Sequence, residues 1–416
     1  MVDLVELTRR FRSVRGASEA LCEPLSPEDC CAQSMPDASP AKWHLAHTSW
    51  FFETLILEKR NGYRPFDPTY RVLFNSYYNS LGEQYPRPHR GLLTRPSFDE
   101  VLAYRGHVDR HILESLENGL DADDLSVLEL GIHHEQQHQE LLLADIKHLL
   151  SQNPLHPVYL AESDGGERAS GAAVADLGWC EIESGVERIG FAGKDFAFDN
   201  ERPRHRVHVE AFALGNRLVT NGEILDFMAD GGYTTPGLWL SDGWARVVSK
   251  GWRAPLYWEQ RGGGWWTFTL SGMRRVRRDE PACHVSYYEA NAYAAWAGAR
   301  LPTETEWEIL ASAVPVEGNF QESGRLHPAP LSSTGPPAQL FGDVWEWTAS
   351  AYAPYPGFRP LTGSLGEYNG KFMSSQMVLR GGSCATAASH IRCTYRNFFY
   401  PEDRWQWSGI RLARDA

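Results

Sequence analysis

Two histidines, His134 and His138, lie four residues apart in the sequence HEQQH. On a helix this spacing places both imidazole rings on one face, one turn apart, where they can bind the same metal ion. The sequence also matches the H-E-x-x-H motif of zinc metalloproteases, in which the glutamate, here Glu135, is the general base. The extended protease motif needs glycine and histidine three and six residues further on, where this chain has Leu141 and Ala144. The pattern therefore favours a metal site of another kind over a protease.

The helical stripe that carries these two histidines also carries Gln137, whereas Glu135 points away from it. Gln137 is therefore expected to lie on the metal's side of the helix. A second predicted helix contains His44 and His47 in WHLAHTSWFFE. Metal sites in helix bundles lie between facing helices, so one of these two histidines is expected to complete a three-histidine site. Three neutral imidazoles with open positions suit zinc or ferrous iron, and the spacing does not choose between them.

The first 150 residues are predicted to form the helices that position these groups. Helix ends are indicated by capping residues, by a capping box at Ser97 and Glu100, and by Asn-Gly pairs. Four helices indicate an antiparallel bundle. The connection 63–96, rich in Pro, Arg and Tyr, is unusually long, and long ordered loops are often functional. The expected helices are 3–20, one that begins at Ser39-Pro40 and ends at Asn61-Gly62, one from Ser97 to Asn118-Gly119, and one from near Asp123 to Ser151.

The second part of the chain, 178–416, is rich in Gly and Trp and has short β-prone runs among long loops. Only SYYEANAYAAWAGA is clearly helical. This indicates a mixed α/β domain with little regular secondary structure. Residues 156–177 lose periodicity and gain Gly, Ala and Ser, so we predict a linker there between a helical domain, 1–155, and the second domain.

Composition excludes several classes of protein. A net charge of −13 gives nucleic-acid binding no electrostatic support, and no run of 18 apolar residues indicates a membrane span. The N-terminal residues show no signal-peptide pattern, which predicts a cytoplasmic protein. Seven cysteines without a C-x-x-C pair indicate neither a zinc ribbon nor a disulfide scaffold.

Taken together, several segments resemble the ergothioneine-type sulfoxide synthases, non-haem iron enzymes that join a sulfur donor to N-α-trimethylhistidine (hercynine). WHLAHTSWFFE, LFNSYYNSLGEQYPRPHRGLLTRP and HHEQQHQELLL resemble the family's damage-inducible-protein-like helical domain. PACHVSYYEANAYAAWAGARLPTETEWE, GDVWEWTAS and YRNFFYPEDRWQWSGIRLAR resemble the domain shared with formylglycine-generating enzyme, a fold related to C-type lectins. The resemblance covers nearly the whole chain, and the order and spacing of the segments are specific. It implies an α plus mixed α/β protein with a helical bundle at its N-terminal end.

The resemblance implies roles for the histidines and for Gln137. His47, His134 and His138 match the iron ligands, which leaves His44 as a structural residue or as support for a ligand. Gln137 matches a glutamine that contacts the histidine-derived substrate, in agreement with its place on the helical stripe.

The long loop carries two further groups of expected site residues. Tyr77 and Tyr78 lie where some members of the family have an active-site tyrosine that supplies a proton or an electron, although two loop tyrosines on their own would suggest packing. Arg87 and Arg90 match the arginines that hold the carboxylate of the sulfur substrate. The chemistry fits, because a guanidinium group binds a carboxylate through two parallel hydrogen bonds.

Near the C-terminus, Asn397 matches a residue beside the trimethylammonium group of hercynine. A quaternary ammonium is held best by aromatic faces, so Phe398, Phe399 and either Trp405 or Trp407 are candidate partners; packing in a core is the ordinary alternative. The branch of the family that uses γ-glutamylcysteine has Asn-Trp-Asp here, with the acid on the donor's amine. This chain has Phe399 where that branch has the aspartate, and the loss of the acid favours free cysteine as the donor.

We therefore expect an enzyme that uses Fe(II) and O2 to join a sulfur donor to hercynine. One alternative is a selenoneine-type synthase that attaches a selenosugar to hercynine. An alternative of another class is a non-catalytic binding module stabilised by a metal. Cys384 and Cys393 do not reproduce the copper-binding cysteines of formylglycine-generating enzyme, so that activity is not expected.

Overall fold

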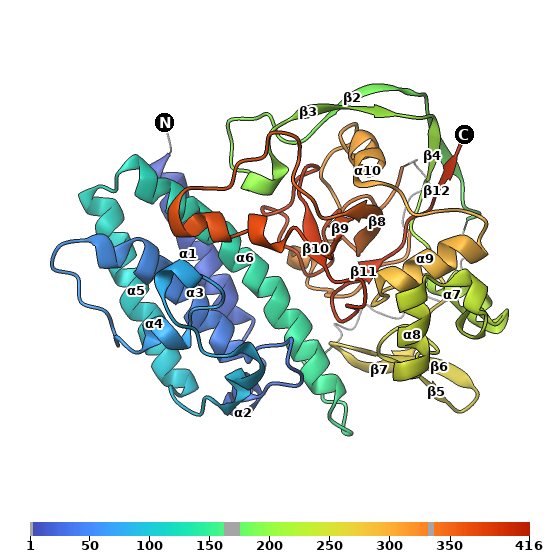
Figure 1. Cartoon of the computed structure of the whole chain (residues 1–416). Coiled ribbons are helices and arrows are strands. Elements are labelled where there is room, and N and C mark those ends of the chain that lie inside the picture. Colours follow the sequence, from blue (N-terminus) through green and yellow to red (C-terminus); the bar gives the residue numbers. More distant parts are fainter. Residues whose placement is uncertain (1–2, 162–174, 332–336) are drawn as a thin grey trace. The chain divides into compact units, whose positions relative to one another are not determined.

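The computed structural model describes residues 3–161, 175–331 and 337–416 (Figure 1). These residues divide into two compact units. The first unit consists of Met1–Tyr159 together with Leu361–Tyr368, and the second consists of Leu160–Pro360 and Asn369–Ala416. Most of the predicted linker 156–177, namely 162–174, lies outside the described residues.

The first unit is built mainly from four long helices, as the sequence predicts. Its short helical turns lie in the connections, and one of them comes from the segment Leu361–Tyr368. The helices are α1 (Leu4–Ala20), α2 (Pro27–Cys31), α3 (Ala41–Leu55), α4 (Tyr70–Leu73), α5 (Phe98–Asn118) and α6 (Ala122–Ser151), and the turns are η1 (Leu57–Lys59), η2 (Asn79–Leu81), η3 (Arg87–Leu92) and η8 (Gly363–Glu367).

Capping explains most of these helix ends. Ser97 accepts a hydrogen bond from the backbone N–H of Glu100, whose carboxylate accepts one from Ser97 N–H, so the predicted capping box at the start of α5 is confirmed. Gly119 follows α5 with a φ of 92°, a left-handed conformation that favours glycine. The predicted cap at Ser39 is wrong. The N-cap position of α3 is occupied by Pro40, and no side chain caps this helix. Ser39 is hydrogen-bonded to Arg90 and Asp145 instead.

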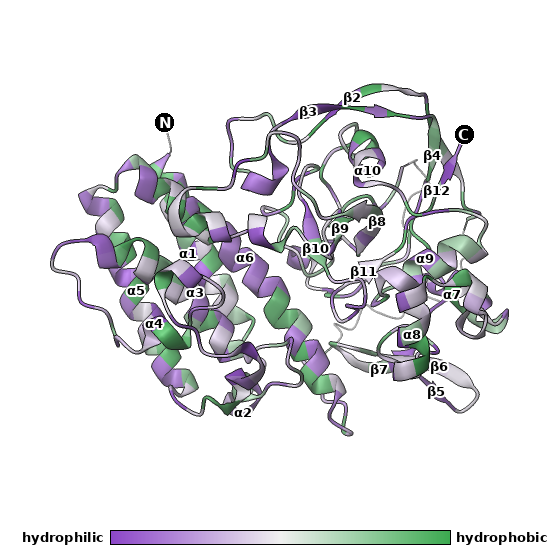
Figure 2. Cartoon of the chain, in the orientation of Figure 1, coloured by the Kyte–Doolittle hydropathy of each residue, from purple (hydrophilic) through white to green (hydrophobic). Residues whose placement is uncertain are grey.

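Helices α3 and α6 approach each other closely. Every residue of α3 is buried, although the helix includes His44, His47 and Glu53. A Cβ added at Gly131 of α6 would lie 2.3 Å from Cε1 of Phe52 on α3, so the buried Phe52 ring would have to move to accept any larger residue. Hydrophilic and hydrophobic bands alternate along α6 (Figure 2), and the polar ones include buried residues. The close contact therefore brings polar groups of the two helices together inside the bundle.

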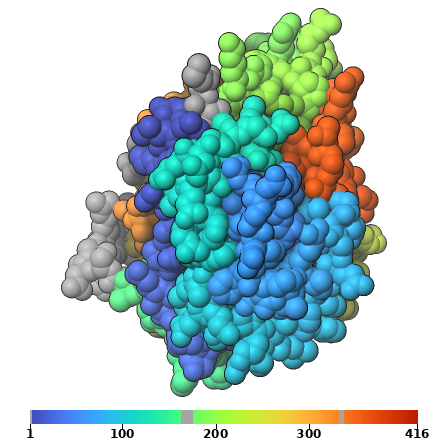
Figure 3. All heavy atoms as spheres, turned by 90° about the vertical axis from the view of Figure 1, so that its left-hand side faces the viewer, coloured from blue at the N-terminus to red at the C-terminus, as the bar shows by residue number. Residues whose placement is uncertain are grey.

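On the face seen in Figure 3, α5 and the connection between α3 and α5, in teal and light blue, cover much of this unit. Within that connection, Asn75 is buried and its amide binds the backbone carbonyls of Tyr78, Gly82 and Glu83, while its Oδ1 accepts from the N–H of Tyr78. One side chain therefore fixes the fold of the loop.

The described residues of the second unit form four small sheets. Their strand orders are β1-β4-β12, β10-β9-β8-β11, β2-β3 and β5-β6-β7, and all neighbouring strands are antiparallel except the parallel pair β8 and β11. The strands are β1 (Trp179–Ile182), β2 (Gly185–Ile189), β3 (His205–Val209), β4 (Phe212–Gly215), β5 (Trp258–Arg261), β6 (Gly264–Thr269), β7 (Gly272–Arg275), β8 (Trp345–Ala351), β9 (Met377–Arg380), β10 (Asn397–Phe399), β11 (Ser408–Gly409) and β12 (Ala413–Asp415).

The second unit also contains more helix than the sequence analysis expected. The predicted helix is α9 (Tyr287–Trp296), and the structure adds α7 (Asn221–Ala229), α8 (Ser241–Lys250) and α10 (Glu304–Ala311). Capping boxes begin α7, α9 and α10, each with Ser or Thr at the N-cap and Glu three residues later. The expectation of a single clear helix here is therefore wrong, while the α plus mixed α/β class is confirmed. No helix among the described residues is long and apolar enough to cross a membrane.

Candidate metal centre

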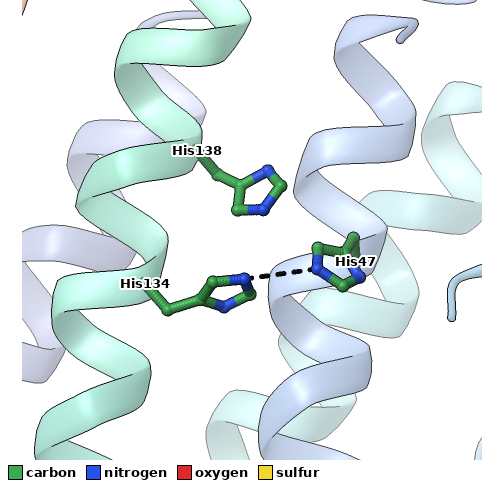
Figure 4. A group of neighbouring side chains, drawn as sticks. All are labelled: His47, His134 and His138. Atoms are coloured by element: carbon green, nitrogen blue, oxygen red, sulfur yellow. Dashed lines mark hydrogen bonds between the residues drawn. The ribbon is translucent and has the colours of Figure 1, made fainter. Parts of the chain in front are cut away.

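His47 on α3 and His134 and His138 on α6 point toward one another inside the first unit (Figure 4). One nitrogen from each ring lies within 4.8 Å of the corresponding nitrogens of the other two. Nε2 of His47 lies 3.3 Å from Nε2 of His134, a separation at which two lone pairs can share one cation. His47 and His134 are fully buried, with 0% and 2% of their surface exposed. The structure therefore brings together the three histidines proposed as ligands.

Their environment favours the neutral imidazole, the form that binds a metal. Burial lowers the pKa of His134 to about 3. Burial and the neighbouring His134 lower the pKa of both His47 and His138 well below the usual value. Nδ1 of His47 lies 2.6 Å from the carbonyl oxygen of Phe74, so Nδ1 donates the hydrogen and Nε2 keeps its lone pair. At neutral pH the cluster offers lone pairs rather than positive charge.

Glu135, the general base of the protease interpretation, lies away from this cluster. Its carboxylate is fully buried and accepts hydrogen bonds from Arg15 Nη1 at 2.9 Å, Arg105 Nη2 at 2.8 Å and Ser18 Oγ at 2.6 Å. Burial alone would raise the pKa of Glu135, but the two guanidinium groups hold it at about 2. Glu135 therefore binds α6 to α1 and α5 and has no position from which to activate a water on the histidines.

Tyr368 connects Gln137 with the histidine cluster, and two further tyrosines, Tyr77 and Tyr78, lie in the same unit. The phenol of Tyr368 donates a hydrogen bond to Oε1 of Gln137, and its ring lies 5.6 Å from that of His134. Tyr77 and Tyr78 stack with ring centroids 4.7 Å apart. Burial, together with Tyr77 and Tyr368, raises the pKa of Tyr78 well above its usual value, so this phenol stays protonated.

Arg90 is buried in the same unit, with 4% of its surface exposed. Its guanidinium carbon lies 3.3 Å from the ring centroid of Trp43, and the Trp43 ring also stacks with that of His47 at 4.7 Å. Nη1 donates to Ser39 Oγ, while Nε has no hydrogen-bond partner in the part of the chain that the structure describes. Burial and the charge of Arg87 lower the pKa of Arg90 to about 8. An anion at this position would relieve the cost of burying the charge.

Arg87, the other predicted arginine, is exposed and donates to the carbonyl of Asp37. The structure therefore does not bury the two arginines together, and Arg90 is the better placed to bind an anion beside the histidines.

Asn397, Phe398 and Phe399 form β10 in the second unit, so a shared pocket with the histidines stays a prediction. Phe398 stacks on Tyr352 with centroids 4.0 Å apart, which leaves at most one ring face for a cation. Phe399 meets Trp405 edge to face at 6.1 Å, the beginning of an aromatic corner. Trp407, in contrast, is fully buried and unavailable to a ligand.

Sequence reasoning missed Tyr368. It lies more than 200 residues beyond α6, in a part of the chain that the sequence assigns to the second domain, yet it belongs to the first unit. Glu367 beside it accepts hydrogen bonds from the backbone N–H groups of Asn79 and Ser80, which fixes the segment on the tyrosine-bearing loop. Nothing local in the sequence signals this contact.

Known proteins match the chain over nearly its whole length. Residues 10–142 match the DinB superfamily, and residues 178–335 and 336–416 match the sulfatase-modifying factor enzyme 1-like domain. Hercynine oxygenase from Mycolicibacterium thermoresistibile is 33% identical over 99% of this chain and 95% of its own length. Hercynine oxygenase from Mycobacterium tuberculosis is 34% identical and covers 93% of both chains. This chain belongs to the hercynine oxygenase family.

Formylglycine-generating enzyme from Streptomyces coelicolor, by comparison, is 29% identical over only 58% of this chain. As a member of the hercynine oxygenase family the chain is an enzyme of the oxygenase type, which confirms the predicted family and overturns the alternative of a non-catalytic binding module. The roles of individual residues, the metal and the donor stay predictions.

Proposed function

We propose that the chain is a non-haem Fe(II) enzyme that uses O2 to join a sulfur donor to C2 of the hercynine imidazole, with oxygenation of the sulfur, as in ergothioneine biosynthesis. The observation that carries this proposal is the cluster of His47, His134 and His138, two of them buried and His138 partly buried, in a chain of the hercynine oxygenase family.

The three histidines fit a ferrous ion. They offer three neutral nitrogen ligands, and imidazole suits iron as well as zinc. The neighbouring Glu135, which could have supplied a fourth ligand, is held by Arg15 and Arg105 on another side of α6. When bound, ferrous iron would supply open coordination positions for the substrates and the redox chemistry with O2. The protein's own contribution is to hold the partners in reacting geometry.

We propose that Gln137 orients hercynine. Its amide is held on one side by the phenol of Tyr368, which fixes the carbonyl oxygen of the amide as an acceptor from that phenol. The amide N–H groups can then donate to a substrate imidazole nitrogen. In the second unit, Asn397 and the corner made by Phe399 and Trp405 are the proposed partners of the trimethylammonium group.

We propose that Arg90 binds the carboxylate of the sulfur donor, because it is a buried cation whose Nε has no hydrogen-bond partner among the described residues, and because it lies against Trp43, which stacks with His47. Free cysteine is favoured over γ-glutamylcysteine, since Phe399 leaves no acid for a donor amine at that position. A selenosugar would make no use of Arg90 as a carboxylate anchor. Tyr77, Tyr78 and Tyr368 are the candidates for holding or delivering a proton, and burial raises the pKa of Tyr78 so that its phenol stays protonated.

The experiment is to load the metal-free protein anaerobically with Fe(II) and to measure O2 uptake and product with hercynine plus cysteine, γ-glutamylcysteine or a selenosugar in turn. We expect uptake that requires hercynine and is fastest with cysteine, and we expect His134→Ala to abolish it. A protein that binds no Fe(II), or a His134→Ala variant that keeps its turnover, would refute the iron proposal. Faster turnover with the selenosugar would instead identify a selenoneine-type synthase.

A further inference from the structure

We infer that Asp145 and His44 are positioning residues that orient His138 and fix the tautomer in which it binds the metal. This inference rests on the metal site proposed above. It comes from a buried chain of hydrogen bonds that runs from the candidate ligand to a carboxylate on the same helix.

The chain begins at the ring nitrogen of His138 that does not face the other ligands. Nδ1 of His138 lies 2.9 Å from Nδ1 of His44, and Nε2 of His44 lies 3.0 Å from Oδ2 of Asp145. His44 and Asp145 are only 4% and 5% exposed. The His44–Asp145 contact is therefore shielded from water, while the His138–His44 contact is partly buried.

The direction of the hydrogen bonds follows from the far end of the chain. Oδ2 of Asp145 also accepts a hydrogen bond from the backbone N–H of Ser39 at 2.7 Å, so this oxygen is an acceptor. His44 must then donate through Nε2, and its Nδ1 is left as an acceptor in the neutral ring. His138 consequently donates through Nδ1, which leaves the lone pair on Nε2 for the metal.

Ser39 is itself held in place. Its Oγ accepts from Nη1 of Arg90 at 2.9 Å, so its backbone N–H stays directed at Asp145. This role also explains why Ser39 does not cap α3, as the sequence had suggested.

The three candidate ligands differ in what supports them. His47 donates to the neutral carbonyl of Phe74, and Nδ1 of His134 has no hydrogen-bond partner among the described residues. Only His138 is connected to a carboxylate, through His44. Hydrogen bonds of this kind fix the orientation of a ligand and increase its basicity, and their loss commonly weakens metal binding about 10- to 100-fold. His138 is therefore the ligand whose strength depends most on residues that do not touch the metal.

The test measures metal binding rather than turnover. Co(II) is titrated into the metal-free parent protein and into His44→Leu, His44→Gln and Asp145→Asn, and both the Kd and the visible Co(II) absorption bands are recorded. We expect His44→Leu and Asp145→Asn to raise the Kd about 10- to 100-fold and to shift the bands. His44→Gln should recover most of the affinity, because glutamine can donate to Asp145 through Nε2 and accept from His138 through Oε1.

The order of the two His44 variants separates positioning from packing. Leucine suits a buried site better than glutamine does, so a purely structural role predicts a more stable and tighter-binding His44→Leu. His148→Leu is the matched control. His148 lies on α6 one turn beyond Asp145, is half-buried, and has Nδ1 2.7 Å from Ser34 Oγ. The Kd of the His148→Leu variant for Co(II) should stay within about twofold of that of the parent. Parent-like affinity and bands in both His44→Leu and Asp145→Asn would overturn the inference. Absence of Co(II) binding in the parent, or its survival in His134→Ala, would refute the metal site itself.

Discussion

The buried carboxylate of Glu135 gives the most quantitative prediction. Glu135→Gln keeps the size of the side chain but removes the charge that lies between Arg15 and Arg105, which are 3% and 0% exposed. Glutamine can keep one accepting oxygen, and its amide group would be directed at guanidinium donors that need acceptors. The change therefore acts on the packing of α6 against α1 and α5, while the metal-facing side of α6 is untouched.

The magnitude follows from the partners that remain. Removing one member of a buried ion pair costs about 3–5 kcal/mol. Here Asp109 still pairs with Arg15 at 2.6 Å and Glu19 with Arg105 at 3.1 Å, so neither guanidinium is left alone. We therefore expect the lower end of that range, a loss of about 3 kcal/mol in the free energy of unfolding of the first unit. With a slope of about 2 kcal/mol per molar urea, the unfolding midpoint falls by about 1.5 M.

The assay is urea unfolding of the metal-free protein, followed by helical circular dichroism, with Glu129→Gln as the matched control. Glu129 lies on the same helix and pairs with Arg10, but both side chains are about a quarter exposed, so its loss should cost less than about 1 kcal/mol. If Glu135→Gln were no less stable than Glu129→Gln, the account of the buried network would be wrong. Folded Glu135→Gln should keep O2 uptake, whereas a general base would lose turnover without losing stability.

Three further changes test the site. Arg90→Met should raise the KM for cysteine at least tenfold, because the carboxylate loses its anchor; an unchanged KM would contradict the proposed anchor. Tyr368→Phe removes the hydrogen bond to Gln137. We expect either the KM for hercynine to rise or kcat to fall, by about tenfold in each case, as measured by O2 uptake. An unchanged melting temperature would show that the fold is intact. Gly131→Ala places a Cβ 2.3 Å from Phe52, so α3 and α6 must move apart; we expect a loss of about 1–3 kcal/mol in unfolding free energy and weaker Co(II) binding, and a parent-like melting curve would show that the contact relaxes without cost.

Local signals in the sequence were sufficient where local contacts decide the structure. Ser97 with Glu100 identified the start of α5, and the helical spacing around His134 placed Glu135 on another side of α6 from the histidines. The same local signal was present at Thr220 and Thr303, where capping boxes begin α7 and α10, but the surrounding glycine-rich sequence concealed those helices.

Distant contacts were not predictable in this way. Ser39 has the residue type and position of an N-cap, yet its polar groups bind Arg90 and Asp145, which lie 51 and 106 residues away. His44 and His47 have the same residue type on one helix, and only the surroundings distinguish the candidate ligand from the residue that supports one. Such assignments depend on which helices meet, and that is a property of the whole fold.

The placement of Leu361–Tyr368 in the first unit has a consequence for how the protein is made. A ribosome completes the four long helices and all three candidate ligands by residue 151, but Tyr368 and Glu367 emerge only after more than 200 further residues. During synthesis the helical unit therefore exists first without its late-arriving tyrosine, and a fragment that ends at Tyr159 would permanently keep that unfinished form. The first unit therefore gains its last segment, Leu361–Tyr368, only after most of the second unit has been translated.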